Sequence, residues 1–230
     1  MSKEELPKNK LKKLNQGIWK CKVCPRFQFL SMPGYFPKNP SILFIGQNPG
    51  QLYTRLSGWS DLSYANKENY QEFQQGYRHG LLEAPLGKWI VQGIQRNTTW
   101  ALTNVIKCRT PNNTKPTDEE IENCRPWLRR QIKLLKPKVI VTLGNPAYEW
   151  FNLMTPIDRV RGKAIHVELE FWDGVMIPMY HPAFNQYKHD KFTLRQMLGA
   201  EAMTINNSLY LEAMEQSPLP PPHVSLRARR

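Results

Sequence analysis

The sequence lacks any long hydrophobic run and any recognisable export signal. No apolar stretch approaches the roughly 20 residues that a membrane-spanning helix needs. The first 16 residues, MSKEELPKNKLKKLNQ, are charged and contain no apolar core of the kind found in signal peptides. We therefore expect a soluble, cytoplasmic protein with no membrane partner.

Acidic residues are also scarce. The chain contains 19 Asp and Glu against 32 Lys and Arg, which gives a formal net charge of +13 over 230 residues. This positive charge is spread along the chain, and no basic amphipathic helix stands out, so nucleic acid is favoured over an anionic membrane surface as the partner. A protein that is merely basic remains the alternative, because net charge by itself predicts only non-specific binding.

The chain has only four cysteines, too few for a disulfide-rich scaffold and more typical of metal ligands or free thiols. Cys21 and Cys24 form a C-x2-C pair that Pro25 follows, whereas Cys108 and Cys124 stand alone. A single such pair differs from zinc sites built on two of them, and proline next to a cysteine ligand is common in iron–sulfur proteins. From spacing alone, an iron–sulfur cluster, a zinc site and unrelated buried thiols all remain open.

Basic residues flank the cysteines. A metal bound by all four cysteines would attach the lysine-rich N-terminus to the rest of the protein. We expect this arrangement to form a shared basic surface that grips phosphates, made of Lys20, Lys22, Arg26, Lys107 and Arg109.

Apolar runs predict four buried strands, at residues 41–46, 100–106, 139–143 and 175–180. Helical stretches separate them. One begins with a capping-box pattern at Thr117–Glu120 and continues to about Leu135, and a short hairpin is predicted within 156–174.

This alternation predicts an α/β protein, a three-layer α/β/α domain with a central, largely parallel four-stranded sheet. The domain is expected over residues 17–215, after a basic leader at 1–16. The proline-rich basic tail, 216–230, is expected to be disordered.

Polar residues follow three of the predicted strands. The loop Gly46-Gln47-Asn48-Pro49-Gly50 leaves the first strand, Asn104 lies near the end of the second, and His181 follows the fourth. Each could be structural: an ordinary strand-to-helix connection, a buried turn amide or a strand cap. Because the carboxyl ends of parallel strands meet at one edge, where ligands bind, together they predict a pocket. Neutral amides with a histidine suit a planar, amide-like ligand and stabilisation of a developing anion.

The order of the motifs C-x2-C, GQNPG, TNVIKCR, PTDEEIENCRPWL, VIVTLGNPA and YHPAF resembles the uracil-DNA glycosylase superfamily over about residues 17–200. The resemblance is closest to the iron–sulfur type known as family 4. It implies a single α/β/α domain, a structural [4Fe-4S] cluster, and base excision repair in which a monofunctional hydrolase removes uracil from single- or double-stranded DNA. We expect the enzyme to be a monomer that flips the uracil nucleotide out of the stack.

The resemblance also implies roles for individual residues. Asn104 matches the asparagine that recognises the uracil edge, and His181 matches the histidine that faces uracil O2. Asn48 is expected to orient the attacking water, and the substrate-binding loop to include Gly46, Gln47 and Gly50. The cluster-ligand positions are taken by Cys21, Cys24, Cys108 and Cys124.

The first motif departs from the family 4 pattern, GEAPG, because Gln47 and Asn48 replace its acidic residue and alanine. An amide cannot act as a general base, so we expect a lower rate than a carboxylate would give. Gly50 stands where family 1 has a tyrosine that blocks the thymine methyl. Two alternatives follow: a glycosylase for hypoxanthine, xanthine or mismatched thymine, and a catalytically silent iron–sulfur DNA-binding module.

Two further roles each have more than one candidate residue. The aromatic that stacks on the base could be Tyr53, Trp59 or Tyr64, and the residue that wedges into the vacated stack could be Phe184 or Asn185. The histidine that covalently trapping relatives carry near TPNNTK is missing, so we expect turnover without a DNA adduct.

Overall fold

The computed structural model describes residues 5–28, 31–50, 98–109, 114–181, 204–207 and 225–227, together with Arg78 and Ile94. Its helices are α1 (Glu5–Trp19), the 3-10 turn η1 (Pro25–Gln28), α5 (Asp118–Leu135), α6 (Asn145–Glu149) and α7 (Ile157–Val160). Its strands are β1 (Ile42–Gly46), β2 (Trp100–Asn104), β3 (Val139–Leu143), β4 (Ile165–Leu169), β5 (Trp172–Met179) and β6 (Ser225–Arg227). No helix in these ranges is both long and apolar enough to cross a membrane.

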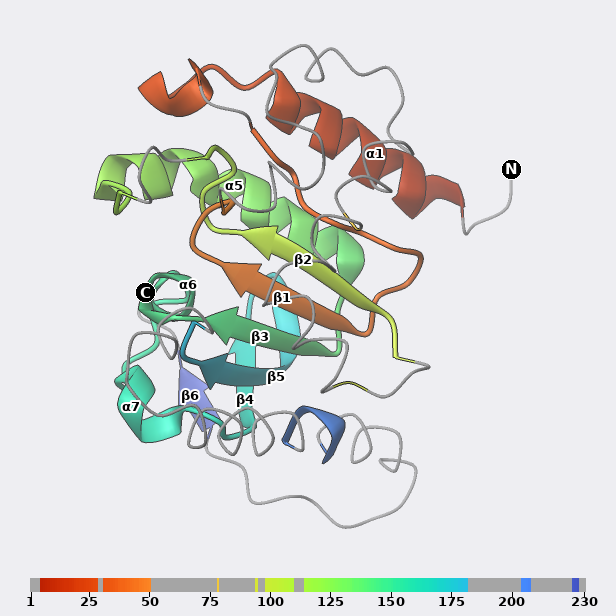
Figure 1. Ribbon diagram of the computed structural model, residues 1–230. Helices are drawn as coiled ribbons and strands as arrows, with labels where there is room; N and C mark the ends of the chain where they lie inside the picture. Colours follow the sequence, from red (N-terminus) through yellow and green to blue (C-terminus); the bar gives the residue numbers. More distant parts are fainter. Residues whose placement is uncertain are drawn as a thin grey trace.

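The strands form one sheet in the order β2-β1-β3-β5-β4-β6. The first four are parallel, with Ile42 of β1 in register with Trp100 of β2 and with Val139 of β3. Figure 1 shows their arrowheads pointing to the same edge. The α/β class and the largely parallel sheet are therefore confirmed.

The predicted number of four strands is too low, since six strands belong to the sheet. The predicted hairpin supplies β4 and the first residues of β5, which pair antiparallel. β6 comes from the tail, where Ser225–Arg227 pairs in parallel with β4 at the edge of the sheet. Disorder was predicted for these three residues, which instead extend the sheet; the rest of 216–230 lies outside the described residues.

Both faces of the central strands are covered, which explains why they are continuous apolar runs rather than alternating ones. On one face, Leu43 and Ile45 pack against Leu128 and Ile132 of α5. On the other, Ile42, Phe44 and their neighbours form a second buried cluster that includes Ile205 from the helical segment 204–207. Helices α1 and α5 lie side by side over the first face, as Figure 1 shows.

Helix α5 has well-defined ends. Thr117 Oγ1 accepts a hydrogen bond from Glu120 N at 3.2 Å, and Glu120 Oε2 accepts one from Thr117 N at 2.8 Å, which confirms the predicted capping box. The helix ends at Lys136, which has the left-handed conformation with φ of 48°.

Helix α1 starts earlier than the predicted domain, because a single helix crosses the expected boundary at residue 16. Gly17 allows its close approach to α5: a Cβ at this position would stand 3.2 Å from Trp127 Cη2. Asn15 and Ile18 are fully buried at this contact. The C-terminal part of the basic leader is thus packed against the core.

We expect Thr117→Ala to lower the free energy of unfolding by about 1 kcal/mol, because it removes the acceptor for an otherwise unpaired amide of the first helical turn. Thr117→Ser keeps the hydroxyl and serves as the matched control, with a stability close to that of the parent protein. Urea denaturation measures both. Equal stability of all three proteins would show that the cap contributes nothing.

Candidate functional site

The carboxyl edge of the parallel strands brings the predicted site residues together. Beyond the regular ladder, Val105 N donates to Gly46 O and Ile106 N donates to Gln47 O, each at 2.9 Å. These bonds join the segment after β2 to the loop after β1. Asn104 therefore lies directly beside that loop, as the parallel register of Gly46 with Asn104 also requires.

Asn104 is buried, with only 5% of its surface exposed. Its Nδ2 has no hydrogen-bond partner within the described part of the chain. Its Oδ1 lies 2.7 Å from the position that a Cβ on Gly46 would occupy, so any larger residue at 46 would displace the amide. A buried amide donor without a partner costs about 1–3 kcal/mol. This donor is available to a ligand at the sheet edge.

The loop after β1 is held by its own amides. Gln47 Nε2 donates to Asn48 Oδ1 at 2.9 Å, and Asn48 Nδ2 donates to Pro49 O at 3.2 Å. Gln47, Asn48 and Gly50 are all half-buried at the end of the described segment. The two bonds orient the side chain of Asn48, but its amide cannot take a proton.

His181 lies at the same edge, two residues beyond β5. Gly144, which follows β3 with φ of 86°, donates its N–H to Met179 O at 2.7 Å. A Cβ on Gly144 would stand 3.4 Å from His181 Cβ, so the imidazole-bearing residue lies against the end of β3. Burial lowers the pKa of His181 below its ordinary value of 6.5, which favours the neutral imidazole at neutral pH.

Neighbouring contacts hold the backbone at His181. Tyr180 donates its hydroxyl hydrogen to Asp158 Oδ1, and the guanidinium of Arg161 lies 4.7 Å from the centre of the Tyr180 ring.

β2 and β5 are separated by β1 and β3, and at about 4.8 Å per strand the ends of β2 and β5 lie about 14 Å apart. Asn104 and His181 therefore lie at the same edge of the sheet, at the ends of two strands that β1 and β3 separate.

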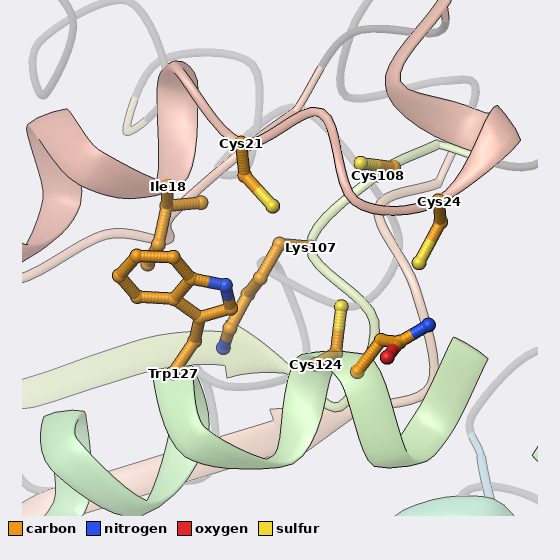
Figure 2. Close-up of a pocket in the computed structure, with 8 residues that line it drawn as sticks. Ile18, Cys21, Cys24, Lys107, Cys108, Cys124 and Trp127 are labelled. Atoms are coloured by element: carbon orange, nitrogen blue, oxygen red, sulfur yellow. The ribbon is translucent and has the colours of Figure 1, made fainter. Parts of the chain in front are cut away.

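The four cysteines line a single cavity between the end of α1, helix α5 and the chain after β2. Figure 2 shows Cys21 and Cys24 arriving from the N-terminal segment, Cys124 from α5, and Cys108 from the chain after β2. The remaining lining comes from Ile18, Lys107, Asn123 and Trp127. The spacing left unrelated buried thiols as an alternative, and the convergence of all four on one cavity argues against it.

Burial is the largest cause of the raised pKa of three of these thiols. It raises the pKa of Cys24 and Cys124 and raises the pKa of Cys108 to about 12, with further increases from the neighbouring cysteines. Among the described residues, no three His, Cys, Asp or Glu side chains lie close enough together to hold one metal ion.

The predicted basic surface around the cysteines is only partly present. Lys20 and Lys22 are exposed. Arg26 instead forms an ion pair with Glu120 of α5, and its other nitrogens donate to Thr114 Oγ1 and Lys115 O, each at 3.4 Å. The contact attaches the segment after Cys24 to the start of α5.

Lys107 is the clearest departure from that prediction, since it is only 2% exposed. Burial lowers its pKa to about 7, an effect that the nearby Cys124 opposes. Its ammonium points away from the thiols in Figure 2 and contacts three oxygen atoms, one of them on Gln131. The burial of Gln131 could have been predicted from the sequence, because it lies three residues after Leu128 on the apolar face of α5. The burial of Lys107 was harder to predict, because the only indication is that it follows two buried apolar residues.

Several predicted roles fall outside the described residues. These are the candidate stacking aromatics Tyr53, Trp59 and Tyr64 and the candidate wedge residues Phe184 and Asn185.

Known proteins match most of the chain. The Type-4 uracil-DNA glycosylase of Sulfurisphaera tokodaii is 32% identical over 184 residues, which cover 77% of this chain and 76% of the relative. That of Archaeoglobus fulgidus is 34% identical over 178 residues, 74% of this chain and 80% of the relative. A Type-5 uracil-DNA glycosylase from Pyrobaculum aerophilum is 26% identical and covers 66% of this chain and 65% of the relative.

The family model of the uracil DNA glycosylase superfamily matches residues 33–202, about three quarters of the chain. The match contains Asn48, Asn104 and His181, as well as Cys108 and Cys124, and it begins after the C-x2-C pair. Together with the parallel sheet and its polar edge, these similarities establish that this chain belongs to the uracil DNA glycosylase superfamily.

Proposed function

We propose that this protein is a monofunctional DNA glycosylase that excises uracil by hydrolysing its N-glycosidic bond. The observation that carries the proposal is the buried amide of Asn104, whose Nδ2 has no partner among the described residues, on the same sheet edge as His181. Similarity to Type-4 uracil-DNA glycosylases supports it.

Asn104 would select the base. Its amide offers one acceptor and one donor side by side, and uracil presents the complementary pair, N3–H and O4. Cytosine presents the opposite pattern, so the same amide would leave unpaired groups against it. The absence of a side chain at Gly46 leaves the room that Asn104 Oδ1 occupies, because a Cβ there would stand 2.7 Å from it.

His181 would stabilise the leaving group. When the glycosidic bond breaks, uracil departs with negative charge on its carbonyl oxygens, and a neutral imidazole can donate an N–H to O2. Loss of one such donor typically raises the barrier by about 3–4 kcal/mol. The lowered pKa of His181 supports a neutral donor.

Asn48 would orient the attacking water. Cleavage passes through a sugar with oxocarbenium character, as in other glycoside hydrolyses. Asn48 Oδ1 accepts from Gln47 but keeps a second lone pair, which can accept a hydrogen bond from water. Because no proton can be taken by this amide, departure of uracil is expected to precede the attack of water.

DNA is the substrate in this proposal. The net charge of +13 and the exposed Lys20 and Lys22 support contacts with phosphates. The uracil nucleotide must leave the stack before its glycosidic bond can be reached. All proposed groups come from one chain, so a monomer suffices, and we expect it to act in the cytoplasm.

We also propose that the four cysteines hold a [4Fe-4S] cluster with a structural role. Each thiolate of such a cluster binds a different iron, so the sulfur atoms stand farther apart than ligands of one shared ion. The four thiols that line one cavity support this proposal. Binding to iron also favours thiolates where burial alone raises the pKa. The cluster would join the N-terminal segment to α5 and the end of β2.

Purified protein should create alkali-labile sites at uracil in an oligonucleotide. We expect Asn104→Ala, His181→Ala and Asn48→Ala each to slow single-turnover excision by about 10²–10³-fold. His166→Ala, in β4, is the matched histidine control and should excise at the parent rate. Absence of cleavage in single-stranded, U:G and U:A substrates by folded protein would refute the proposal. Parallel substrates with hypoxanthine, xanthine and mismatched thymine define the base range left open by Asn48 and Gly50.

His181 should make stability depend on pH in one direction. Its pKa is lowered in the folded state, so the unfolded state takes up the proton first as the pH falls through 6.5. Stability is therefore expected to fall below about pH 6.5 and to show no contribution from His181 above it. Urea midpoints of the parent protein minus those of His181→Gln, measured between about pH 5 and 8, isolate this effect. A difference that stays flat across this range would show that the folded pKa is not lowered.

Freshly purified protein should be brown, with broad visible absorbance and about four iron atoms per chain. Cys124→Ser should lose most of this absorbance. Trp127→Phe, which changes the cavity wall without removing a thiol, should keep it. A colourless protein with one zinc per chain would contradict the iron assignment.

A further inference from the structure

Lys107 brings its amino group into the interior, where Nζ lies within hydrogen-bond distance of three oxygen atoms. Nζ donates to Asn104 O at 2.6 Å, to Gln131 Oε1 at 2.7 Å and to Thr103 Oγ1 at 2.8 Å. An ammonium has three donors, and all three are used. None of these acceptors is a carboxylate, so the desolvation of the charge is offset by neutral oxygens alone.

The acceptors are themselves fixed from several elements. Gln131 is fully buried on α5, and its Nε2 donates to Asn15 Oδ1 of α1 at 3.0 Å and to Pro33 O at 3.1 Å. The hydroxyl of Thr103 lies 2.8 Å from Pro33 O. The network around Lys107 therefore joins the end of β2 to two helices and to the segment before β1. A satisfied buried network of this kind is rigid.

The side chain of Asn104 has no comparable support of its own. Its Nδ2 is unpaired among the described residues, and its Oδ1 lies 2.7 Å from the position that a Cβ on Gly46 would occupy. The direction of the amide therefore depends on where the backbone of residue 104 stands. Beyond the sheet ladder, the backbone of residue 104 is held by the 2.6 Å bond from Lys107 Nζ to its carbonyl oxygen.

We propose that Lys107 is a positioning residue for base recognition. By its hydrogen bond to Asn104 O, it fixes the backbone at the end of β2 and so the orientation of the Asn104 amide. Lys107 does not touch the base. The inference rests on the proposed function of Asn104, and it assigns Gln131 and Thr103 as the supports of Lys107. A change at Lys107 then acts through Asn104 and has no separate effect on the chemistry.

A double-mutant cycle tests this inference. Single-turnover uracil excision is measured for the parent protein, Lys107→Met, Asn104→Ala and the double variant. We expect Lys107→Met to slow the parent by about tenfold or more and to slow Asn104→Ala by less than about twofold. Free uracil, as an inhibitor, should bind Lys107→Met more weakly than it binds the parent protein, and it should bind Asn104→Ala and the double variant equally weakly.

Two further variants keep the test decisive. Gln131→Leu removes one acceptor of the ammonium, and it should show the same coupling to Asn104→Ala if Lys107→Met does not fold. Ile132→Val is the control for a merely destabilised α5, and its small effect should be equal in both backgrounds. Visible absorbance is recorded for each variant, because Lys107 is adjacent to Cys108. Excision rates are compared only between variants with equal absorbance.

The outcomes separate the two proposals. Equal slowing by Lys107→Met and Gln131→Leu in both backgrounds, with Asn104→Ala strongly impaired, would overturn the inference and leave the proposed function intact. Unimpaired excision by Asn104→Ala would instead remove the assigned role of Asn104, and the inference with it.

Discussion

The parallel register of β2, β1, β3 and β5 is the constraint on which the rest of the structure depends. A parallel ladder places all carboxyl ends at one edge, whatever the length of the connections between strands. A slip by one residue would move every side chain of β1 to the opposite face, and because both faces are buried, the fit of these side chains to the two layers specifies the register. Packing of apolar residues thus determines where the polar residues after each strand meet.

Two polar features lie where this sheet meets the helices α1 and α5. The four cysteines converge between the helices and the end of β2, and the network around Lys107 begins at the adjacent residue. Unpaired groups in such an interior are costly, so each must find a partner or a ligand. Lys107 finds its partners within the protein. The donor of the Asn104 amide has no partner among the described residues, and the same holds for Thr142 Oγ1 and Trp150 Nε1.

Much of this arrangement is predictable from local pattern. The strand at 139–143 was predicted at its observed bounds, and the capping box at Thr117 because its hydrogen bonds span only three residues. Two strands at one side of the sheet were not predicted as separate strands: β4 was expected only as part of a hairpin, and β6 is three residues long in a proline-rich tail. A strand that short carries no periodic signal, and its pairing with β4 depends on residues about 60 positions away.

The sequence by itself determined the α/β class, the largely parallel sheet, the family, and the identity of the polar residues that follow the strands. These follow from apolar periodicity and from short motifs. The tertiary structure alone decided that Lys107 is buried, that Gly46 must leave room for Asn104, and that Arg26 is engaged by Glu120. The physical reason is that each depends on atoms brought together by packing. A lysine after a strand has the same local sequence whether its ammonium meets water or three buried oxygens.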